Sequence, residues 1–157
     1  MRLNRKGQAV LGVGDGTVSV DGRVLTAGGG ACWLTEDTVL YQTRHEGRYV
    51  LEATSTATGI QTLVADHGAN ELAAGGGRWA SWGPSGVHTS TGAAYPRAGL
   101  LDVSREGVIV LCPDRQAGTE AVLLSPTGAS STVQAVVAYG VRLVESVLVW
   151  VQGGRVR

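Results

Sequence analysis

The side chains that could perform chemistry in this sequence of 157 residues are few and scattered. Its three histidines are His45, His67 and His88. We expect His45 at a solvated hairpin tip, His67 in a polar loop beside Asp66, and His88 on a strand as a hydrogen-bonded structural residue. A metal ion would need several more oxygen or nitrogen ligands close by. The sequence therefore predicts neither a metal site nor a cofactor, and contact with a ligand or partner is the alternative for His45.

Two cysteines and one glycine-rich segment are the other groups with chemical potential. Cys32 and Cys112 lie in apolar runs, 80 positions apart, which favours free, buried thiols over a disulfide or a reactive thiol. The segment Gly12–Gly16 is only faintly similar to a phosphate-binding loop, because neither a helix nor a Lys-Ser/Thr pair follows it. No pattern of nucleophile, base and metal ligand stands out, so the sequence does not predict an enzyme.

Charge and hydrophobic content narrow the classes of protein that the sequence fits. Thirteen Lys and Arg residues balance thirteen Asp and Glu residues, so we expect no basic surface for nucleic acid or anionic lipid. Hydrophobic residues make up 43% of the sequence, which is enough for the core of one ordinary domain.

No targeting segment and no membrane segment are predicted. The basic stretch Met1–Lys6 is followed by Gly7 and Gln8 rather than by the long apolar run of a signal peptide. The most apolar region, Val133–Val151, contains charged residues and a glycine that a membrane helix would tolerate poorly. We therefore expect a soluble protein, located in the cytoplasm or in a virion.

Short apolar runs rich in Val, Thr, Leu, Tyr and Trp, each closed by a turn-forming residue, predict an all-β fold. Glycines between the runs supply the positive φ angles that hairpin turns require. The predicted strands are Ala9–Val13, Thr17–Val20, Arg23–Thr26, Thr38–Thr43, Arg48–Thr54, Ile60–Ala65, Arg78–Trp82, Gly86–Thr91, Gly99–Ser104, Val108–Cys112, Glu120–Ser125, Thr132–Tyr139 and Val147–Val151.

Several patterns recur at a spacing of 69 residues. The segments that overlay at this spacing are Val13–Val18 with Trp82–Val87, Val39–Tyr41 with Val108–Val110, and Thr58-Gly59 with Thr127-Gly128. Two runs of three glycines, Gly28–Gly30 and Gly75–Gly77, each precede a tryptophan and are expected to mark the start of a new unit. Such recurrence is typical of stacked or radially arranged units, none of which can bury its apolar face alone.

Two stretches resemble blades of a β-propeller of the TolB or WD40-like type. The residues that carry the resemblance are Trp33–Tyr41, Arg44–Gly47, Tyr49–Leu51, Thr58-Gly59 and Leu63-Val64, and then Asp102–Leu111, Ala121–Leu124 and Thr127-Gly128. The resemblance implies a propeller-like array of about four short antiparallel blades. We expect one β-repeat domain over residues 1–157 with units 9–31, 32–77, 78–98 and 99–140, and a partial unit 141–157. A β-sandwich or a β-solenoid is the alternative.

Two sets of residues are predicted to contact a partner. Arg44 and His45 lie one period before Asp114, so Arg115 and Gln116 are expected at an equivalent hairpin tip on the same rim. Trp79 and Trp82 are three positions apart, which places them on opposite faces of a regular strand. Packing between blades accounts for most tryptophans of such a chain, but one of these two could be exposed and bind a partner or a sugar ring.

The predicted function is that of a non-catalytic structural or protein-interaction module within a larger assembly, for example a phage virion. Its expected partners are other protein chains, either further copies of itself or other subunits of the assembly, because an incomplete ring of blades would expose a sheet edge. A carbohydrate-binding, lectin-like propeller is the alternative, based on the tryptophans and the polar turns. A propeller hydrolase is a third hypothesis, which would need a pocket with converging acidic or histidine side chains.

Overall fold

A computed structural model describes residues 3–13, 16–114, 120–134, 142–144, 147–149, 151–152 and 155–156. These residues form β-strands, turns and loops and contain no helix. The chain divides into two compact units, the N-terminal unit Met1–Leu72 and the C-terminal unit Ala73–Arg157. The fold class is therefore all-β, with four small open antiparallel sheets of three or four strands among the described residues.

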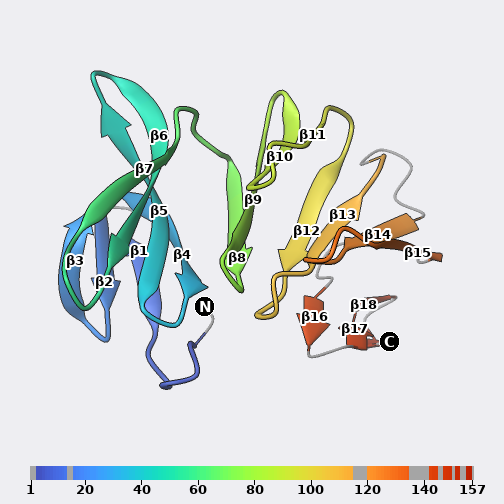
Figure 1. Cartoon of the computed structure of the whole chain (residues 1–157), viewed down its shortest axis with the longest axis horizontal. Coiled ribbons are helices and arrows are strands. Elements are labelled where there is room, and N and C mark those ends of the chain that lie inside the picture. Colours follow the sequence, from blue (N-terminus) through green and yellow to red (C-terminus); the bar gives the residue numbers. More distant parts are fainter. Residues whose placement is uncertain are drawn as a thin grey trace. The chain divides into compact units, whose positions relative to one another are not determined.

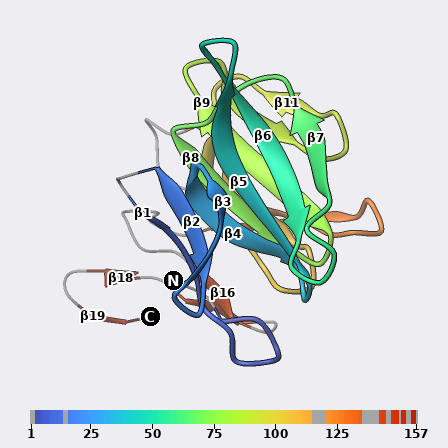
Figure 2. The same cartoon turned by 90° about the vertical axis from the view of Figure 1, so that its left-hand side faces the viewer.

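The N-terminal unit contains two antiparallel sheets (Figure 1). The first sheet consists of β1 (Val10–Val13), β2 (Thr17–Val20) and β3 (Arg23–Ala27). The second consists of β4 (Gly29–Thr35), β5 (Thr38–His45), β6 (Arg48–Ser55) and β7 (Gln61–Ala65). The β5–β6 hairpin is the longest, and its tip projects past the neighbouring strands of the unit (Figures 1 and 2).

Alternating side chains join the two sheets of the N-terminal unit in one core. Val10 and Val18 from the first sheet pack against Trp33, Val39 and Tyr41 from the second. Residues two apart on a strand share a face, so these residues identify the inward face of each sheet.

Polar contacts fix the edge of the same unit, where the turn before β1 meets the turn between β4 and β5. The Asn4 side-chain amide donates to the Glu36 carbonyl oxygen at 3.0 Å. Lys6 and Asp37 form an ion pair beside it. These contacts hold the start of the first sheet against the second.

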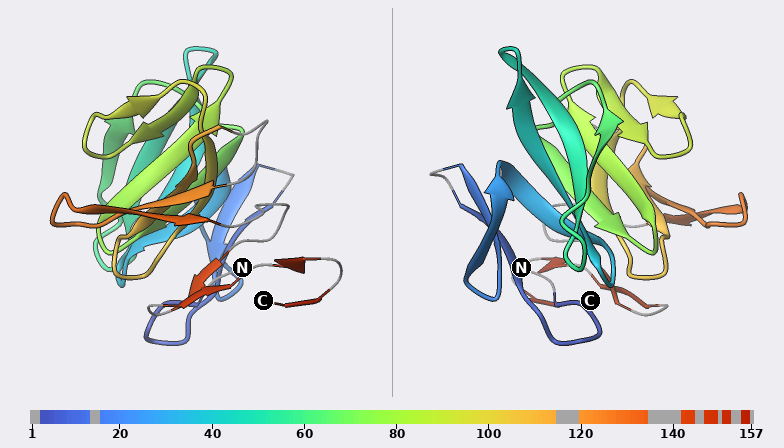
Figure 3. Two further views of the ribbon diagram at one scale, coloured as in Figure 1. Left: turned by 90° about the vertical axis from the view of Figure 1, so that its right-hand side faces the viewer. Right: turned by 60° about the vertical axis from the view of Figure 1, so that its left-hand side comes forward.

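The C-terminal unit contains two four-stranded sheets (Figure 3). The first, in the order β11-β10-β9-β8, consists of β8 (Glu71–Gly75), β9 (Arg78–Gly83), β10 (Gly86–Thr89) and β11 (Ala94–Tyr95). The second consists of β12 (Gly99–Val103), β13 (Ile109–Cys112), β14 (Glu120–Leu124) and β15 (Ser130–Gln134). The boundary between the units falls inside β8. Because β8 pairs with β9, it belongs to the first sheet of the C-terminal unit.

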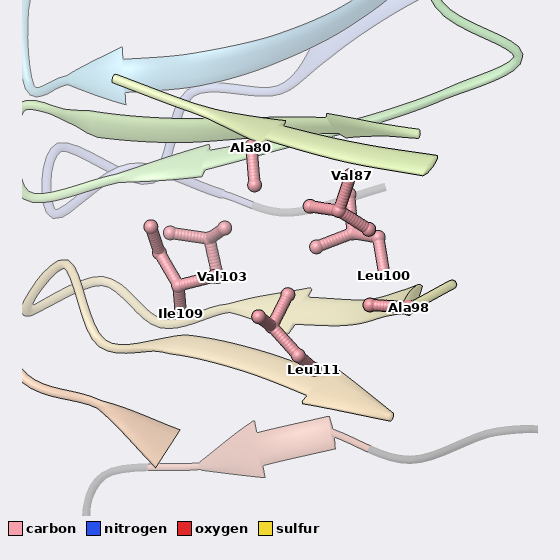
Figure 4. Packing of buried hydrophobic residues seen from close by; sticks show 7 residues of the cluster. All are labelled: Ala80, Val87, Ala98, Leu100, Val103, Ile109 and Leu111. Carbon is pink, nitrogen blue, oxygen red and sulfur yellow. The ribbon is translucent and has the colours of Figure 1, made fainter. Parts of the chain in front are cut away.

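The core of the C-terminal unit is built from small and branched apolar side chains. Ala80 and Val87 of one sheet point toward Leu100, Val103 and Ile109 of the other (Figure 4). The Arg78 guanidinium ties the two sheets together as well, because it donates to the carbonyl oxygens of Gly107 at 2.8 Å and Leu124 at 3.0 Å.

Short hairpins complete the described part of the chain. The pairs are β16 (Arg142–Val144) with β17 (Val147–Val149), and β18 (Val151–Gln152) with β19 (Arg155–Val156). No helix in this part of the chain could cross a membrane.

A recurring local design explains several of the tight turns. A polar residue begins the turn, and a glycine three positions later has a positive φ and donates its N–H to the carbonyl oxygen of that first residue. The pairs of first residue and glycine are Asn4 with Gly7, Thr89 with Gly92, Ser104 with Gly107, and Ser125 with Gly128.

Most predicted strands are confirmed, and the differences have physical causes. The strands that were not predicted are β4, β8 and β11, together with β16 and β19 near the C-terminal end. Glycine and alanine occupy much of β8 and much of the start of β4, so neither segment shows the branched residues typical of strands. The glycine run Gly75–Gly77 lies in the turn between β8 and β9 of one sheet, whereas Gly28–Gly30 connects two sheets. The predicted strand Thr132–Tyr139 is described only as far as Gln134.

The ladders correct two of the predicted overlays by one residue. Leu40 pairs with Ala53, and Val110 pairs with Leu123. Both members of the first pair lie 70 positions before those of the second, so β5 and β13 correspond at a spacing of 70. The residue equivalent to Val39 is therefore Ile109 and not Val108. A slip of one residue exchanges the two faces of a strand, so the overlay of Val39–Tyr41 with Val108–Val110 is wrong.

The overlay of Val13–Val18 with Trp82–Val87 contains a gap for a similar reason. Val18 pairs with Gly12 in its sheet, and Val87 pairs with Trp82 in its own. Since Val18 and Val87 are equivalent, their partners Gly12 and Trp82 are equivalent as well. The cause is the connection between the strands, which has one residue more between β1 and β2 than between β9 and β10.

Candidate binding site in the N-terminal unit

A hollow of about 500 Å³ opens beside the junction of the two sheets of the N-terminal unit. Its wall is made by Gly12 of β1, Gly16 before β2, Ala27 and Gly28 at the end of β3, and Gly29 and Gly30 of β4. Its rim is made by Gln42, Thr43 and Arg44 of β5 and by Tyr49 of β6. The wall therefore presents mostly backbone, and the rim presents side chains.

Close approach of backbone segments requires glycine at two places in the wall. A Cβ atom on Gly12 would lie 2.8 Å from the backbone nitrogens of Gly30 and Ala31. A Cβ atom on Gly28, whose φ is +152°, would lie 2.7 Å from both the carbonyl oxygen of Gln42 and the Tyr41 ring. The wall is thus fixed by packing of main chain on main chain.

The rim of the hollow carries the Arg44 guanidinium, which lies over an aromatic ring, and the hydrogen-bonded side-chain amide of Gln42. The Arg44 guanidinium carbon lies 4.9 Å from the centroid of the Tyr49 ring, a cation–π distance. Arg44 and Tyr49 are partners in the β5–β6 ladder, which places both on one face. The Oε1 atom of Gln42 accepts a hydrogen bond from the backbone N–H of Ala69, which orients the amide. Arg44 is the one charged side chain that lines the hollow among the described residues.

A second polar cluster lies on the opposite face of the same hairpin. His45 Nε2 is 2.7 Å from Glu52 Oε1, and the Tyr41 hydroxyl donates to Glu52 Oε2 at 3.0 Å. The same hydroxyl lies 3.0 Å from Thr54 Oγ1. Glu52 is buried, with 8% of its surface exposed, so its carboxylate depends on these partners. The prediction of a simply solvated His45 is therefore incomplete, because its imidazole is held by a buried carboxylate.

Burial raises the pKa of Tyr41. Desolvation disfavours the phenolate and is the largest cause. Hydrogen bonds from Thr54 and Thr26 lower the pKa, whereas the hydrogen bond to Glu52 and its negative charge raise it. Tyr41 therefore stays neutral at physiological pH and serves as a hydrogen-bond donor to Glu52.

The outward face of the first sheet carries a group of exposed apolar side chains. Leu11 faces away from the core because it alternates with Val10, and it pairs with Ser19, which pairs in turn with Val24. Leu3 joins this face through its bridge to Ala9. Leu3, Leu11 and Val24 are 47%, 46% and 64% exposed. We call the residues Leu3, Ala9, Leu11, Ser19 and Val24 the outward apolar face.

The two predicted tryptophans lie on opposite faces of β9, as expected, but neither is fully exposed. Trp79 is buried, with 8% of its surface exposed. Trp82 is half-buried and packs against the core of the C-terminal unit. The second predicted pair, Arg115 and Gln116, lies outside the described residues.

The remaining reactive groups have structural partners. Cys112 is buried and donates to the carbonyl oxygen of Asp114 at 3.1 Å, whereas Cys32 is only half-buried. Neither cysteine forms a disulfide. His88 lies 2.9 Å from the Ser85 hydroxyl through its Nε2 atom. In the described part of the chain, no group of three or more His, Cys, Asp or Glu residues could hold a metal ion.

Sequence reasoning placed Arg44 and His45 at a hairpin tip, where the structure has them, but did not single out Gln42, Tyr49 and Glu52. The signal that could have found them is strand alternation across the hairpin Glu46-Gly47, which places residues 45 and 48 opposite each other. Counting outward from that pair puts Arg44 beside Tyr49 and His45 on the face of Glu52. The hollow itself carries no such signal, because it depends on which glycines approach which backbone.

Comparison of this chain with models of protein families, with curated proteins and with solved structures finds no match.

Proposed function

We propose that this protein is a non-catalytic interaction module of the β-propeller type, in which stacked four-stranded sheets form a platform within a larger assembly such as a virion. The propeller arrangement is supported by the consecutive strand order that the three four-stranded sheets share, β4-β5-β6-β7, β8-β9-β10-β11 and β12-β13-β14-β15. It is further supported by the spacing of 69 to 70 residues between ladder positions in the two units.

The observation that carries the interaction function is the outward apolar face of the first sheet. The face is open, although its composition of leucine, valine and alanine is that of the inward faces that pack sheet on sheet. Exposed apolar side chains that are contiguous on one sheet are typical of contact surfaces.

The occupant of this face is a second copy of the chain. None of the five residues of the outward apolar face is charged, and the neighbouring Asp21 carboxylate accepts the backbone N–H of Ala9, so two copies can meet on the apolar side chains. A surface that meets its own copy forms a two-fold interface, which is the commonest way for soluble chains to associate.

Sedimentation velocity over a range of protein concentrations tests the proposal. The wild-type chain is expected to sediment as a dimer at high concentration, and the double variant Leu11→Lys/Val24→Lys as a monomer. The matched control is Ile60→Lys/Leu63→Lys, since Ile60 and Leu63 are 65% and 56% exposed and lie outside the outward apolar face.

The control is expected to remain dimeric. A wild-type chain that stays monomeric at every concentration, or a control that dissociates as readily as the test variant, overturns the proposal. Circular dichroism spectra of the variants should match that of the wild type, because all four substituted side chains are exposed.

A further inference from the structure

The hollow of the N-terminal unit has features of a ligand site that the interaction function does not require. Its volume of about 500 Å³ lies within the range of about 300 to 1,000 Å³ that is usual for small-molecule sites. The wall is preformed, because Gly12 and Gly28 fit there only without side chains. A ligand would therefore meet a rigid surface and lose little free energy in ordering it.

The wall offers hydrogen-bonding groups of the main chain. A β-bulge separates the pair Gly29–Gln42 from the pair Cys32–Leu40, and the register gives Gly30 and Ala31 no partner on β5. Residues inside a bulge leave the ladder, so their N–H and C=O groups need other partners. The nitrogens of Gly30 and Ala31 lie against Gly12 of β1, so a ligand can approach this main chain only from the open side of Gly29 and Gly30, where a Cβ atom would meet nothing within 4 Å.

The rim offers one positive charge. The Arg44 guanidinium lies over the Tyr49 ring, and a planar guanidinium binds a carboxylate through two parallel hydrogen bonds. Gln42 adds an amide whose Oε1 is already engaged by Ala69, so its Nε2 group is the donor that remains available to a ligand. Tyr49 is 51% exposed and adds an aromatic edge and a hydroxyl group.

We propose that this hollow binds an acidic saccharide, a sugar that carries one carboxylate per ring. The carboxylate pairs with Arg44, and the hydroxyl groups of the ring exchange hydrogen bonds with Gln42, Tyr49 and the main chain around Gly30. A single cation matches a single carboxylate, and a wall of main-chain donors and acceptors matches a ligand with many hydroxyl groups.

Two other anionic ligands fit the hollow less well. Inorganic phosphate is small and doubly charged, and the described rim offers it one cation and leaves most of the volume empty. An acidic peptide would gain most of its affinity by pairing with a free strand edge, whereas β5 is free on its β4 side only over Thr43–His45, beyond the pair Gly29–Gln42.

Isothermal titration calorimetry of the full chain tests the proposal with four ligands. They are trigalacturonate, its neutral methyl ester, triglutamate and inorganic phosphate. We expect trigalacturonate to bind and its ester to bind at least about tenfold more weakly, since a hydrogen bond to a charged group is lost with each carboxylate.

Variants of the rim locate the binding. Arg44→Gln should weaken the binding of trigalacturonate at least about tenfold. Arg44→Lys should restore it in part, because lysine keeps the charge without the planar fork. Arg48→Gln is the matched control, since Arg48 is an exposed arginine of the same hairpin that does not line the hollow. We expect this control to bind as the wild type does.

Four outcomes would overturn the proposal. They are absence of trigalacturonate binding, equal binding of the ester, tighter binding of triglutamate or phosphate, and equal losses in the Arg44 and Arg48 variants. Dimerisation measured by sedimentation is independent of this result, because the outward apolar face contains none of the rim residues.

Discussion

The β5–β6 hairpin of the N-terminal unit and the β13–β14 hairpin of the C-terminal unit have equivalent residue pairs, but one pair is polar and the other is apolar. Tyr41 pairs with Glu52 in the N-terminal unit, and Leu111 pairs with Val122 in the C-terminal unit. Leu111 packs in an apolar core, whereas Tyr41 donates a hydrogen bond to a buried carboxylate. One backbone design thus tolerates either a polar network or an apolar layer, provided that each buried polar atom has a partner.

The junction between the sheets differs in the same way. Trp82 pairs with Val87 and fills space beside the core of the C-terminal unit. Gly12 occupies the corresponding place opposite Val18, where the backbone of β4 comes close enough to exclude a side chain. The hollow lies beside this glycine. The position that Trp82 fills in the C-terminal unit is held by Gly12 in the N-terminal unit, and there it borders a candidate binding site.

The largest expected effect comes from removing the tryptophan from the C-terminal unit. Trp82→Ala should lower the free energy of unfolding by about 2–3 kcal/mol, somewhat less than for a fully buried tryptophan because Trp82 is half-buried. Urea denaturation followed by circular dichroism measures the change. Trp82→Leu, which keeps part of the apolar contact, should lose less. Equal losses in both variants would mean that the side chain does not fill the junction.

The next effect comes from adding a side chain to the N-terminal unit. Gly12→Ala should lower the free energy of unfolding by about 2 kcal/mol, since its Cβ atom would collide with the backbone nitrogens of Gly30 and Ala31. Gly29→Ala is the matched control, because a Cβ atom there meets nothing within 4 Å. Denaturation with urea should show a loss below about 0.5 kcal/mol for the control. A tolerated alanine at Gly12 would contradict the close approach of β1 and β4.

The sequence predicts the strands and the class of fold because alternation and turn glycines are local properties. Thr17–Val20 has the predicted bounds. The face of each strand could not be predicted by a single spacing, because loops such as that between β1 and β2 differ by one residue. The place of Arg44 and His45 at a hairpin tip was predicted from the turn Glu46-Gly47, and their role in binding stays a prediction. The hollow and the partner of His45 were missed, since both depend on side chains and main chain that only the folded sheets bring together.

A smaller effect tests the polar network of the N-terminal hairpin. In a double-mutant cycle of Tyr41→Phe and Glu52→Gln, each single change weakens the same hydrogen bond, so we expect a coupling free energy of about 1 kcal/mol. The control cycle of Glu52→Gln with Thr54→Val should give a lower coupling, because the hydrogen bond of Thr54 is to the Tyr41 hydroxyl. Coupling that is equal in both cycles would argue against a specific bond between Tyr41 and Glu52.

The smallest expected effect is a pH dependence that the apolar hairpin of the C-terminal unit cannot show. Burial, followed by the influence of Glu52, raises the pKa of Tyr41 above the usual tyrosine value of about 10. Above that pH the unfolded chain releases the phenolic proton while the folded chain retains it. The contribution of Tyr41 to stability is therefore complete below about pH 10 and is lost as the pH rises through the pKa of the folded state.

Urea denaturation at about pH 9 and at about pH 11 measures this dependence. The wild-type chain should lose more stability between the two values than Tyr41→Phe, which has no proton to release at this position. Tyr49→Phe is the matched control, because Tyr49 is half exposed and lies on the other face of the same hairpin. A Tyr41→Phe variant that destabilises with pH as steeply as the wild type would show that folding does not raise the pKa of Tyr41.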